Sequence, residues 1–477
     1  MTTAPTATTR DALVASELAA LPERIADPAA AVAGAPVVVV LDDDPTGTQT
    51  VRDVPVLTAW DEDGLRWALR QGRAGFFVLT NTRSLDPADA AARVREIARA
   101  ARAAADAEGV EIVFASRGDS TLRGHYPLET DVLRDQERAA GRRVDAVLLA
   151  PAYLDAGRLT VDGVHWVADR SGRAIPVADS EFARDSTFGF AASSLPEWVA
   201  EKTGGAVPAE RVEVLSLTSL RRDDVEAIAA RLAALPADAV VAIDAERDDD
   251  LRVAAAAVAM AERAGSRFLY RTGPSFVRSR LGQTSSAPVD DATLRAGASP
   301  DSAPHGLVVV GSHVGLTTRQ LDGLRDARPI LELELDVARV DDPAQRDQLV
   351  ARAVAGLAAR TVVVRTSRVV RTGADRDESL AIARGVSAAV IDVVRGILDR
   401  AAPAFLVAKG GITSSDVATE GLELRRAWVE GPMLPGIVSV WRAVDGRRPG
   451  MPYIVFAGNV GDETSLAAVV ERLDAAR

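Results

Sequence analysis

Short runs of β-branched and other apolar residues alternate along the chain with longer Ala-, Arg- and Glu-rich stretches. This alternation is typical of strands and helices arranged around a mainly parallel sheet. Six runs in the first part of the chain have the length and composition of buried strands, at residues 35–43, 75–81, 111–116, 145–151, 238–244 and 267–271. Five more follow in the second part, at residues 305–312, 330–336, 360–367, 403–410 and 452–458.

Between these runs, residues 86–109 and 347–361 have the spacing of Ala-rich amphipathic helices. Residues 283–304 are rich in Ser, Ala, Pro and Asp without apolar periodicity, which predicts a linker. A chain of 477 residues is also too long for one core. The predicted fold is therefore α/β with two lobes, each a mainly parallel sheet flanked by helices, and with a cleft between them. The predicted parts are a tail at 1–35, a first domain at 36–282, a linker at 283–304 and a second domain at 305–477.

Composition narrows the classes of function. The formal net charge of −12 argues against non-specific binding to nucleic acid or anionic membranes. The absence of cysteine excludes disulfides, thiolate metal sites and a cysteine nucleophile. No signal peptide is recognised, and no apolar run approaches the roughly 20 residues of a membrane-spanning helix. We therefore expect a cytoplasmic protein that binds small molecules, and a homodimer is compatible with the sequence.

Three adjacent carboxylates follow the first predicted strand, at Asp42, Asp43 and Asp44. Ligands of open parallel sheets bind where strands leave the sheet. Adjacent carboxylates repel one another, so they require donors or a cation to compensate. A structural alternative is that they cap the following turn. A second alternative is a haloacid-dehalogenase-like phosphatase, in which Asp42 would be the phosphoryl acceptor and Asp44 the acid/base.

A second polar cluster follows the strand at 111–116. Its chemistry-bearing residues are Ser116, Arg117, Asp119, Ser120, Thr121, Arg123, Gly124 and His125. Guanidinium groups there can bind a carboxylate bidentately, and Asp and hydroxyl side chains can bind a polyol. Further along, Arg158 is a candidate second anion clamp, beside Asp162 and His165. A capping box and a β-hairpin through residues 160–167 are the structural alternatives for these two segments.

In the second half of the chain, three predicted strands end in glycine-containing turns. Each alone needs glycine only for backbone geometry. Together they would converge on one sheet edge and form a phosphate-sized concavity lined by amides. Gly311 belongs to the first turn, and Lys409 is a weaker candidate for a phosphate contact. The nucleotide-binding candidates are Ser312, Gly410, Gly411, Ile412, Thr413, Gly458, Asn459 and Gly461. Neither a Walker nor a Rossmann fingerprint is present.

Six segments in this order resemble the motifs of the four-carbon acid sugar kinases, a family once catalogued as a domain of unknown function. The segments are LDDDPTGTQTVRDVPVLT, NTRSL, SRGDSTLRGH, PAYLDAGRLTVDGVHWV, KGGITSSDVATEGL and FAGNVGDETSL. The resemblance implies a sugar-acid-binding N-terminal lobe and a nucleotide-binding C-terminal lobe. It also implies transfer of the γ-phosphoryl group of ATP to a tetronate-type acid.

Carried over by motif, Asp43 and Asp44 match the paired aspartates of the family. The substrate-binding candidates are Asp43, Asp44, Arg117, Asp119, Ser120, Arg123 and Arg158. Arg117 stands where lysine is expected in shorter members, which leaves the acid recognised open. Asp44 is the expected catalytic base, and Mg²⁺ is expected to bridge the ATP phosphates with no metal ligand assigned. A non-catalytic sugar-acid sensor is the rival from another class.

Overall fold

The protein is described here by a computed structural model covering residues 6–169, 171–285, 287–296, 301–368, 376–458 and 460–476, apart from the side chains of residues 376–381. The chain divides into two compact units. The first comprises Met1–Val51 and Trp60–Ser285, and the second comprises Arg52–Ala59 and Ser286–Arg477. Both are α/β, which confirms the predicted fold class. Residues 52–59 therefore belong to a different unit from the residues that flank them.

The first unit contains a parallel sheet in the order β3-β1-β4-β11-β5-β10-β9. Its strands are β1 Val37–Asp42, β3 Gly75–Leu79, β4 Ile112–Arg117, β5 Ala146–Ala150, β9 Val212–Leu215, β10 Ala239–Ile243 and β11 Phe268–Thr272. Because β1 lies between β3 and β4, Asp42 is in register with Leu79 on one side and Arg117 on the other. The carboxyl ends of these strands thus lie together at one sheet edge.

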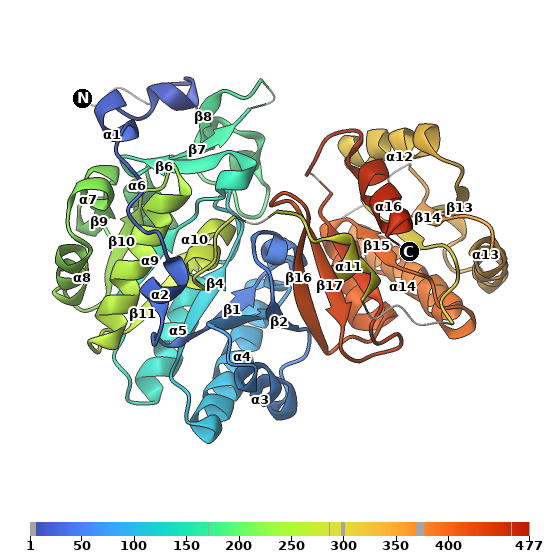
Figure 1. Ribbon diagram of the computed structural model, residues 1–477, viewed down its shortest axis with the longest axis horizontal. Coiled ribbons are helices and arrows are strands. Elements are labelled where there is room, and N and C mark those ends of the chain that lie inside the picture. The colour runs from blue at the N-terminus through green and yellow to red at the C-terminus, as the bar shows by residue number, and fades with distance from the viewer. Residues whose placement is uncertain are drawn as a thin grey trace. The chain divides into compact units, whose positions relative to one another are not determined.

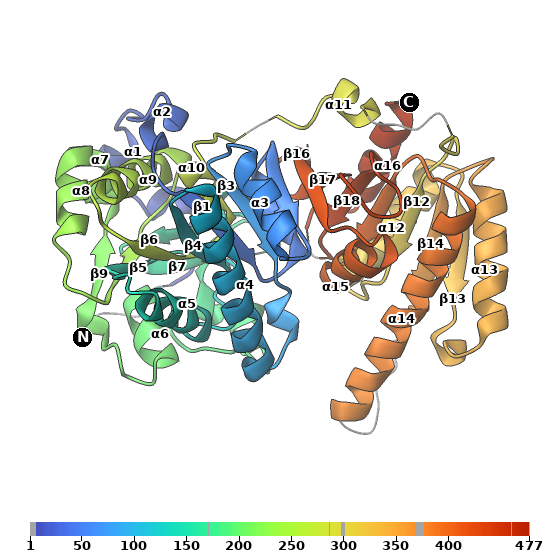
Figure 2. The same ribbon diagram turned by 90° about the horizontal axis from the view of Figure 1, so that it is seen from below.

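Helices cover both faces of this sheet, with α4 and α5 on one face and α8, α9 and α10 on the other (Figures 1 and 2). The helices of the unit are α1 Ser16–Ala19, α2 Pro28–Val32, α3 Glu62–Arg70, α4 Pro87–Glu108, α5 Leu128–Ala139, α6 Leu195–Lys202, α7 Leu217–Arg222, α8 Val225–Ala233, α9 Asp248–Arg263 and α10 Pro274–Arg280. The signals that bound α4 are visible in the sequence. Asp86 caps its first turn through the N–H groups of Ala88 and Asp89, and Gly109 ends it with a φ of 66°.

A separate antiparallel sheet of the first unit consists of β6 Arg158–Val161, β7 Val164–Ala168 and β8 Ala174–Pro176. The turn between β6 and β7 is formed by Asp162 and Gly163, whose φ values are 50° and 72°. Positive φ at both positions is what a tight hairpin turn requires. The hairpin considered for residues 160–167 is therefore present.

The second unit contains a mixed sheet in the order β13-β14-β12-β15-β18-β17-β16-β2. Its strands are β2 Val54–Leu57, β12 Leu307–Val310, β13 Leu331–Leu335, β14 Val362–Thr366, β15 Leu406–Lys409, β16 Arg426–Leu434, β17 Val438–Ala443 and β18 Pro452–Phe456. The strands β13, β14, β12, β15 and β18 are parallel to one another. The pairs β18–β17, β17–β16 and β16–β2 are antiparallel. Its helices are α11 Asp291–Arg295, α12 Gly315–Ala327, α13 Pro343–Gly356, α14 Arg376–Arg400, α15 Gly411–Asp416 and α16 Ser465–Ala475.

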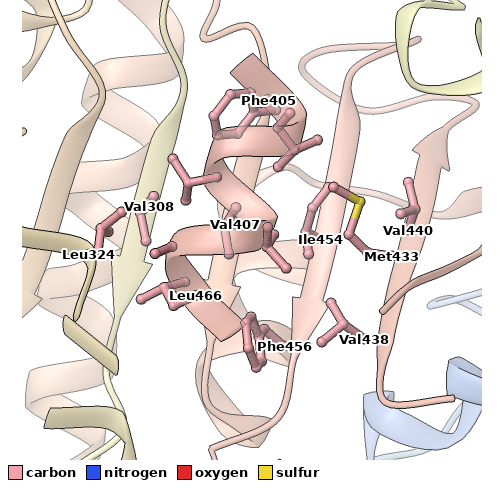
Figure 3. Close-up of a cluster of buried hydrophobic side chains, with 14 of the residues drawn as sticks. Val308, Leu324, Phe405, Val407, Met433, Val438, Val440, Ile454, Phe456 and Leu466 are labelled. Carbon is pink, nitrogen blue, oxygen red and sulfur yellow. The ribbon is translucent and has the colours of Figure 1, made fainter. Parts of the chain in front are cut away.

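The core of the second unit packs β12, β15, β18 and β17 against α12 and α16 (Figure 3). Val407, Ile454 and Leu466 are fully buried there. Part of the predicted linker also contributes, because Val289 and the α11 residue Leu294 belong to the same cluster. Among the described residues, no helix combines the length and apolar character needed to cross a membrane.

Candidate functional sites

The aspartate triplet of the first unit is held in place by two arginines from neighbouring strand ends. Arg117, the last residue of β4, donates from Nε to Asp42 and from Nη2 to the carbonyl oxygen of Asp44 at 2.8 Å. Asp42 and Arg117 are 1% and 3% exposed. Burial raises the pKa of the Asp42 carboxyl to about 7, although the adjacent Arg117 favours its charged form. The Asp42 carboxylate and the Arg117 guanidinium therefore form a buried ion pair.

Asp43 is likewise buried, and it binds Arg83 bidentately. Nε of Arg83 donates to Oδ2 at 3.0 Å, and Nη2 donates to Oδ1 at 2.6 Å. Arg83 belongs to the NTRSL segment that follows β3, to which the sequence analysis assigned no role. Its position shortly after a predicted strand is a local signal, but its pairing with Asp43 depends on β3 lying beside β1 in the sheet. Asp43 is thus positioned by a cation that the sequence analysis did not select.

Asp44 is the accessible member of the triplet, with 20% of its side chain exposed. Its Oδ1 accepts from the Thr46 N–H at 2.9 Å and from Thr46 Oγ1 at 2.5 Å, so it also caps the following turn. Burial acts to raise its pKa, but Arg83, Arg117 and the Thr46 hydrogen bonds outweigh this and lower the pKa below its ordinary value. Asp44 is therefore an ionised carboxylate at neutral pH.

The loop after β4 brings together the other candidates of the first unit. Asp119 accepts from Arg123 Nε at 2.6 Å, and its carboxylate lies 3.9 Å from Arg158. Ser120 Oγ accepts from Arg158 Nη1 at 2.6 Å. The guanidinium groups of Arg123 and Arg158 lie 5.1 and 5.5 Å from the centre of the Phe182 ring. Their side chains are 24% and 16% exposed, so these two cations remain accessible while Arg117 does not.

The two histidines near this loop have structural contacts. His165 is fully buried, with Nε2 2.8 Å from the Ser120 carbonyl oxygen and Nδ1 3.0 Å from Thr160 Oγ1. A carbonyl can only accept, so Nε2 carries the hydrogen. Burial lowers the pKa of His165 to about 4, and the ring is neutral. His125 contacts the carbonyl oxygens of Thr82 and Leu85.

A buried network beneath the loop was missed by the sequence analysis. Arg271, on β11, donates to Ser116 Oγ at 2.8 Å and to Glu129 Oε2 at 3.1 Å. The same arginine reaches the Arg123 carbonyl oxygen at 3.2 Å. A Cβ atom added at Gly118 would overlap the Arg271 guanidinium, so glycine is needed there for this close approach. Ser116 is thus a support for the loop.

In the second unit, the strand register aligns the three glycine turns. Val310 pairs with Lys409, and Lys409 pairs with Phe456, so the residues that follow them begin at one edge of the sheet. The turns touch: a Cβ added at Gly458 would lie 2.7 Å from Ser312 Oγ, and one added at Gly311 would overlap Thr413 Oγ1. The predicted convergence of these turns is therefore observed.

Side chains of α12 form hydrogen bonds to the first and third glycine turns. Thr317 Oγ1 lies 3.1 Å from both Ser312 Oγ and the Gly458 carbonyl oxygen. Gln320 Nε2 donates to the carbonyl oxygens of Val460 and Asp462 at 3.0 and 2.8 Å. The remaining candidates Gly410, Gly411, Ile412 and Gly461 lie in the second and third turns, whereas Asn459 lies outside the described residues.

Lys409 does not reach the surface of these turns. It is fully buried, its Nζ donates to the Ala457 carbonyl oxygen, and this atom lies 4.0 Å from the centre of the Phe456 ring. Burial lowers the pKa of its ammonium group to about 7. Instead of contacting a phosphate as considered above, Lys409 connects the end of β15 to the residue before Gly458.

Lys409→Met should change how stability depends on pH. Between about pH 7 and 10.5 the folded protein releases a proton from Lys409 that the unfolded chain keeps, so wild-type stability rises with pH through this window. The melting temperature of the variant relative to wild type should fall as pH rises from 6.5 to 9.5, by about 2–4 °C or more. Thermal unfolding followed by circular dichroism measures this difference. Leu406→Met, on the same strand, should show no such trend, and a constant difference for Lys409→Met would contradict the lowered pKa.

Comparison with known proteins assigns both units. A family model for a sugar-binding N-terminal domain matches residues 38–280, and a model for a nucleotide-binding C-terminal domain matches residues 307–466. The chain belongs to the four-carbon acid sugar kinase family. The family's sugar-binding domain includes the aspartate triplet and the loop after β4. Its nucleotide-binding domain includes Gly311, Gly410 and Gly458.

Solved structures share the fold of this family. A Haemophilus influenzae protein of the DUF1537 family is 17% identical, with a TM-score of 0.59 over 92% of this chain and 99% of that one. A Salmonella typhimurium LT2 protein, described provisionally as a tRNA synthase, is also 17% identical, with a TM-score of 0.66 over 91% of this chain and 98% of that one. At this identity the likeness shows the fold alone. A comparison with curated proteins gives no match.

Proposed function

We propose that this chain is an ATP-dependent kinase that phosphorylates a hydroxyl of a four-carbon sugar acid of the threonate, erythronate or oxo-tetronate type. The observation that carries the proposal is the convergence of three glycine turns at one sheet edge in the second unit. Backbone N–H groups at such turns bind phosphates. The pairing of this unit with a sugar-binding domain supports phosphoryl transfer to a sugar derivative.

In the nucleotide site, the turns at Gly311, Gly410 and Gly458 would bind the ATP phosphates, with Ser312 and Thr413 as hydroxyl donors. Among the described residues there is no group of three or more His, Cys, Asp or Glu side chains that could hold a metal ion. Mg²⁺ normally takes most of its ligands from water and substrate phosphates. We therefore include Mg²⁺ as the counter-ion of ATP and assign it no residue of this chain.

In the sugar-acid site, Arg158 and Arg123 would bind the substrate carboxylate, because they are partly accessible and Arg83, which is also partly accessible, is paired bidentately with Asp43. Asp119 and Ser120 would orient them and accept from substrate hydroxyls. Arg117 is too buried to reach a substrate, so its role would be to fix Asp42 and the backbone of Asp44. Asp43, paired with Arg83, would act in the same supporting way.

Asp44 would orient the attacking hydroxyl. That oxygen forms a bond to the γ-phosphorus while the bond to the β,γ-bridging oxygen breaks, ADP leaves, and the hydroxyl proton passes to Asp44. In a loose phosphoryl-transfer transition state the proton is lost late, so a carboxylate of lowered pKa is a sufficient acceptor. Its main contribution is alignment of the hydroxyl and stabilisation of the partial positive charge on its hydrogen.

The test is ADP release on incubation with ATP and each of D- and L-threonate, D- and L-erythronate and their oxo relatives. A kinase makes ADP and sugar-acid phosphate in equal amounts, and absence of both with every acid would reject the proposal. A non-catalytic sensor would bind an acid without consuming ATP. The phosphatase alternative requires an accessible Asp42, which its 1% exposure argues against.

Arg158→Met should raise the KM for the acid about 10- to 100-fold, because a charge-assisted hydrogen bond is removed while the apolar stem is kept. The KM for ATP should change little. Initial rates at varied acid and varied ATP separate the two constants. Arg184→Met is the matched control, since Arg184 is exposed on the neighbouring 3₁₀ turn Glu181–Arg184. An unchanged acid KM in Arg158→Met would move the carboxylate site elsewhere.

A further inference from the structure

A cavity of about 270 Å³ opens beside the glycine turns of the second unit. Most of its wall is apolar and comes from α14, α15 and their neighbours, at Val337, Ile382, Ala383, Val386, Val390, Ile391, Ile412 and Val417. Ile412 is 67% exposed, which is unusual for a large apolar side chain in this protein. An apolar recess with few polar groups is typical of a site for the flat, apolar part of a small molecule.

The polar side chains among the described lining residues are His313, Thr366, Ser387, Thr413 and Asp416. His313 Nε2 lies 3.0 Å from the Ser367 carbonyl oxygen. Thr366, at the end of β14, is 1% exposed, and its Oγ1 has no hydrogen-bond partner among the described residues. Leaving a buried hydroxyl unpaired is costly, so a bound molecule that pairs with it gains affinity. Asp416, the last residue of α15, is the only carboxylate among the described lining residues, and one of its oxygens accepts from Ser387 Oγ. Its other oxygen accepts no hydrogen bond from any residue that the structure describes.

The cavity is continuous with the candidate phosphate site. Gly311 and Thr413, which form that site, also line the cavity, and the second-turn residues Gly411, Ile412 and Thr413 are the first residues of α15. A molecule whose phosphates lie on the turns would therefore extend its other end into the cavity. In a nucleoside triphosphate that end is the base, whose apolar faces suit the valine and isoleucine walls. Ribose hydroxyls would leave polar groups unpaired against those walls.

We propose that the cavity binds adenine and that Asp416 selects it over guanine by accepting a hydrogen bond from the exocyclic amino group. This inference rests on the proposed function. The free carboxylate oxygen of Asp416 can only accept, so it favours an amino group at that position of the purine and disfavours the carbonyl oxygen that guanine presents there. Thr366 Oγ1 would donate to a ring nitrogen, which removes its unpaired state.

The experiment compares ATP, GTP and 2′,3′-dideoxy-ATP by isothermal titration calorimetry on the full chain. Wild type should bind ATP about 10- to 100-fold more tightly than GTP, the range for a hydrogen bond to a charged group. In Asp416→Asn, the Ser387 hydroxyl can still donate to the oxygen of the new amide. The amide NH₂ group then points toward the base. The preference for ATP should then be lost or reversed. Asp399→Asn, an exposed carboxylate paired with Arg447, should keep the wild-type ratio.

Thr366→Val is a second, nearly isosteric variant. It removes a buried unpaired hydroxyl, so the free protein should melt at the same or a higher temperature while ATP affinity falls. A ratio of ATP to GTP affinity in Asp416→Asn equal to that of wild type would overturn the assignment. The assignment would also fail if wild type bound dideoxy-ATP more weakly than ATP and Asp416→Asn bound both equally, because the ribose would then lie at Asp416. Binding of ATP with the predicted selectivity but no phosphorylation of any acid would reject the kinase and keep this inference. Absence of ATP binding to wild type would reject both.

Discussion

Asp44→Asn should lower the turnover of sugar-acid phosphorylation by about 10²- to 10⁴-fold, the usual contribution of a positioned proton acceptor. The amide keeps the shape of the side chain and can still cap Thr46, because asparagine is as good a capping residue as aspartate. The negative charge that would orient the hydroxyl is lost. The affinity for ATP should stay within about twofold of wild type, since the binding turns belong to the second unit.

Steady-state rates give the turnover number, and calorimetry gives the ATP affinity. Asp63→Asn provides the control, because Asp63 is an exposed carboxylate of the same unit on α3. Wild-type turnover in Asp44→Asn would remove Asp44 from the mechanism. A large fall in the melting temperature of Asp44→Asn would instead indicate that the buried Asp42–Arg117 pair is damaged.

Gly311→Val is expected to weaken ATP binding about 10- to 100-fold or more. Any Cβ at this position overlaps Thr413 Oγ1, so either Thr413 rotates its hydroxyl away or the turn moves. In both cases a donor to a charged phosphate is displaced, and each such hydrogen bond is worth about 1.5–3 kcal/mol. Acid binding to the first unit should persist.

Gly315→Ala is the matched control for that substitution. The nearest atom to a Cβ at Gly315 is Arg319 Nη1 at 3.6 Å, an ordinary contact, and the residue begins α12 near the same turns. Its ATP affinity should equal that of wild type. If calorimetry gave wild-type affinity for Gly311→Val as well, the nucleotide would have to bind away from the converging turns.

The fold was predictable where strands are buried on both faces. The eleven predicted runs correspond to β1, β3, β4, β5, β10, β11, β12, β13, β14, β15 and β18. The antiparallel strand β16 was not predicted, because Gly431 and Pro432 interrupt its apolar pattern and the pairing shifts register at these positions. The strand β17 is largely buried and was also not predicted. The assignment of residues 52–59 to the second unit depends on pairing between β2 and β16, which are distant in sequence. Hydrophobic periodicity carries no such information.

For the candidate sites too, features of short segments could be predicted from the sequence, whereas contacts between distant segments could not. Strand ends and glycine turns are local features, and they identified the aspartate triplet and the converging turns. Which charge is buried depends on the partners that the sheet brings alongside. Arg117 was expected to bind substrate but lies under the triplet, and the pairing of Arg83 with Asp43 depends on the order β3-β1-β4. The apolar cavity could not be foreseen, because its wall combines α14 with residues after β12 and at the end of β14.

Residues 52–59 belong to the second unit, and this limits where the chain can be cut to obtain the two units separately. A chain cut after Ser285 would keep β2 while losing β16, and an apolar strand would be left with a bare hydrogen-bonding edge that invites self-association. The complementary fragment would lack the strand that closes its sheet. Working halves would therefore require a short bridge between Val51 and Trp60 in the first fragment, with the excised strand fused to the second.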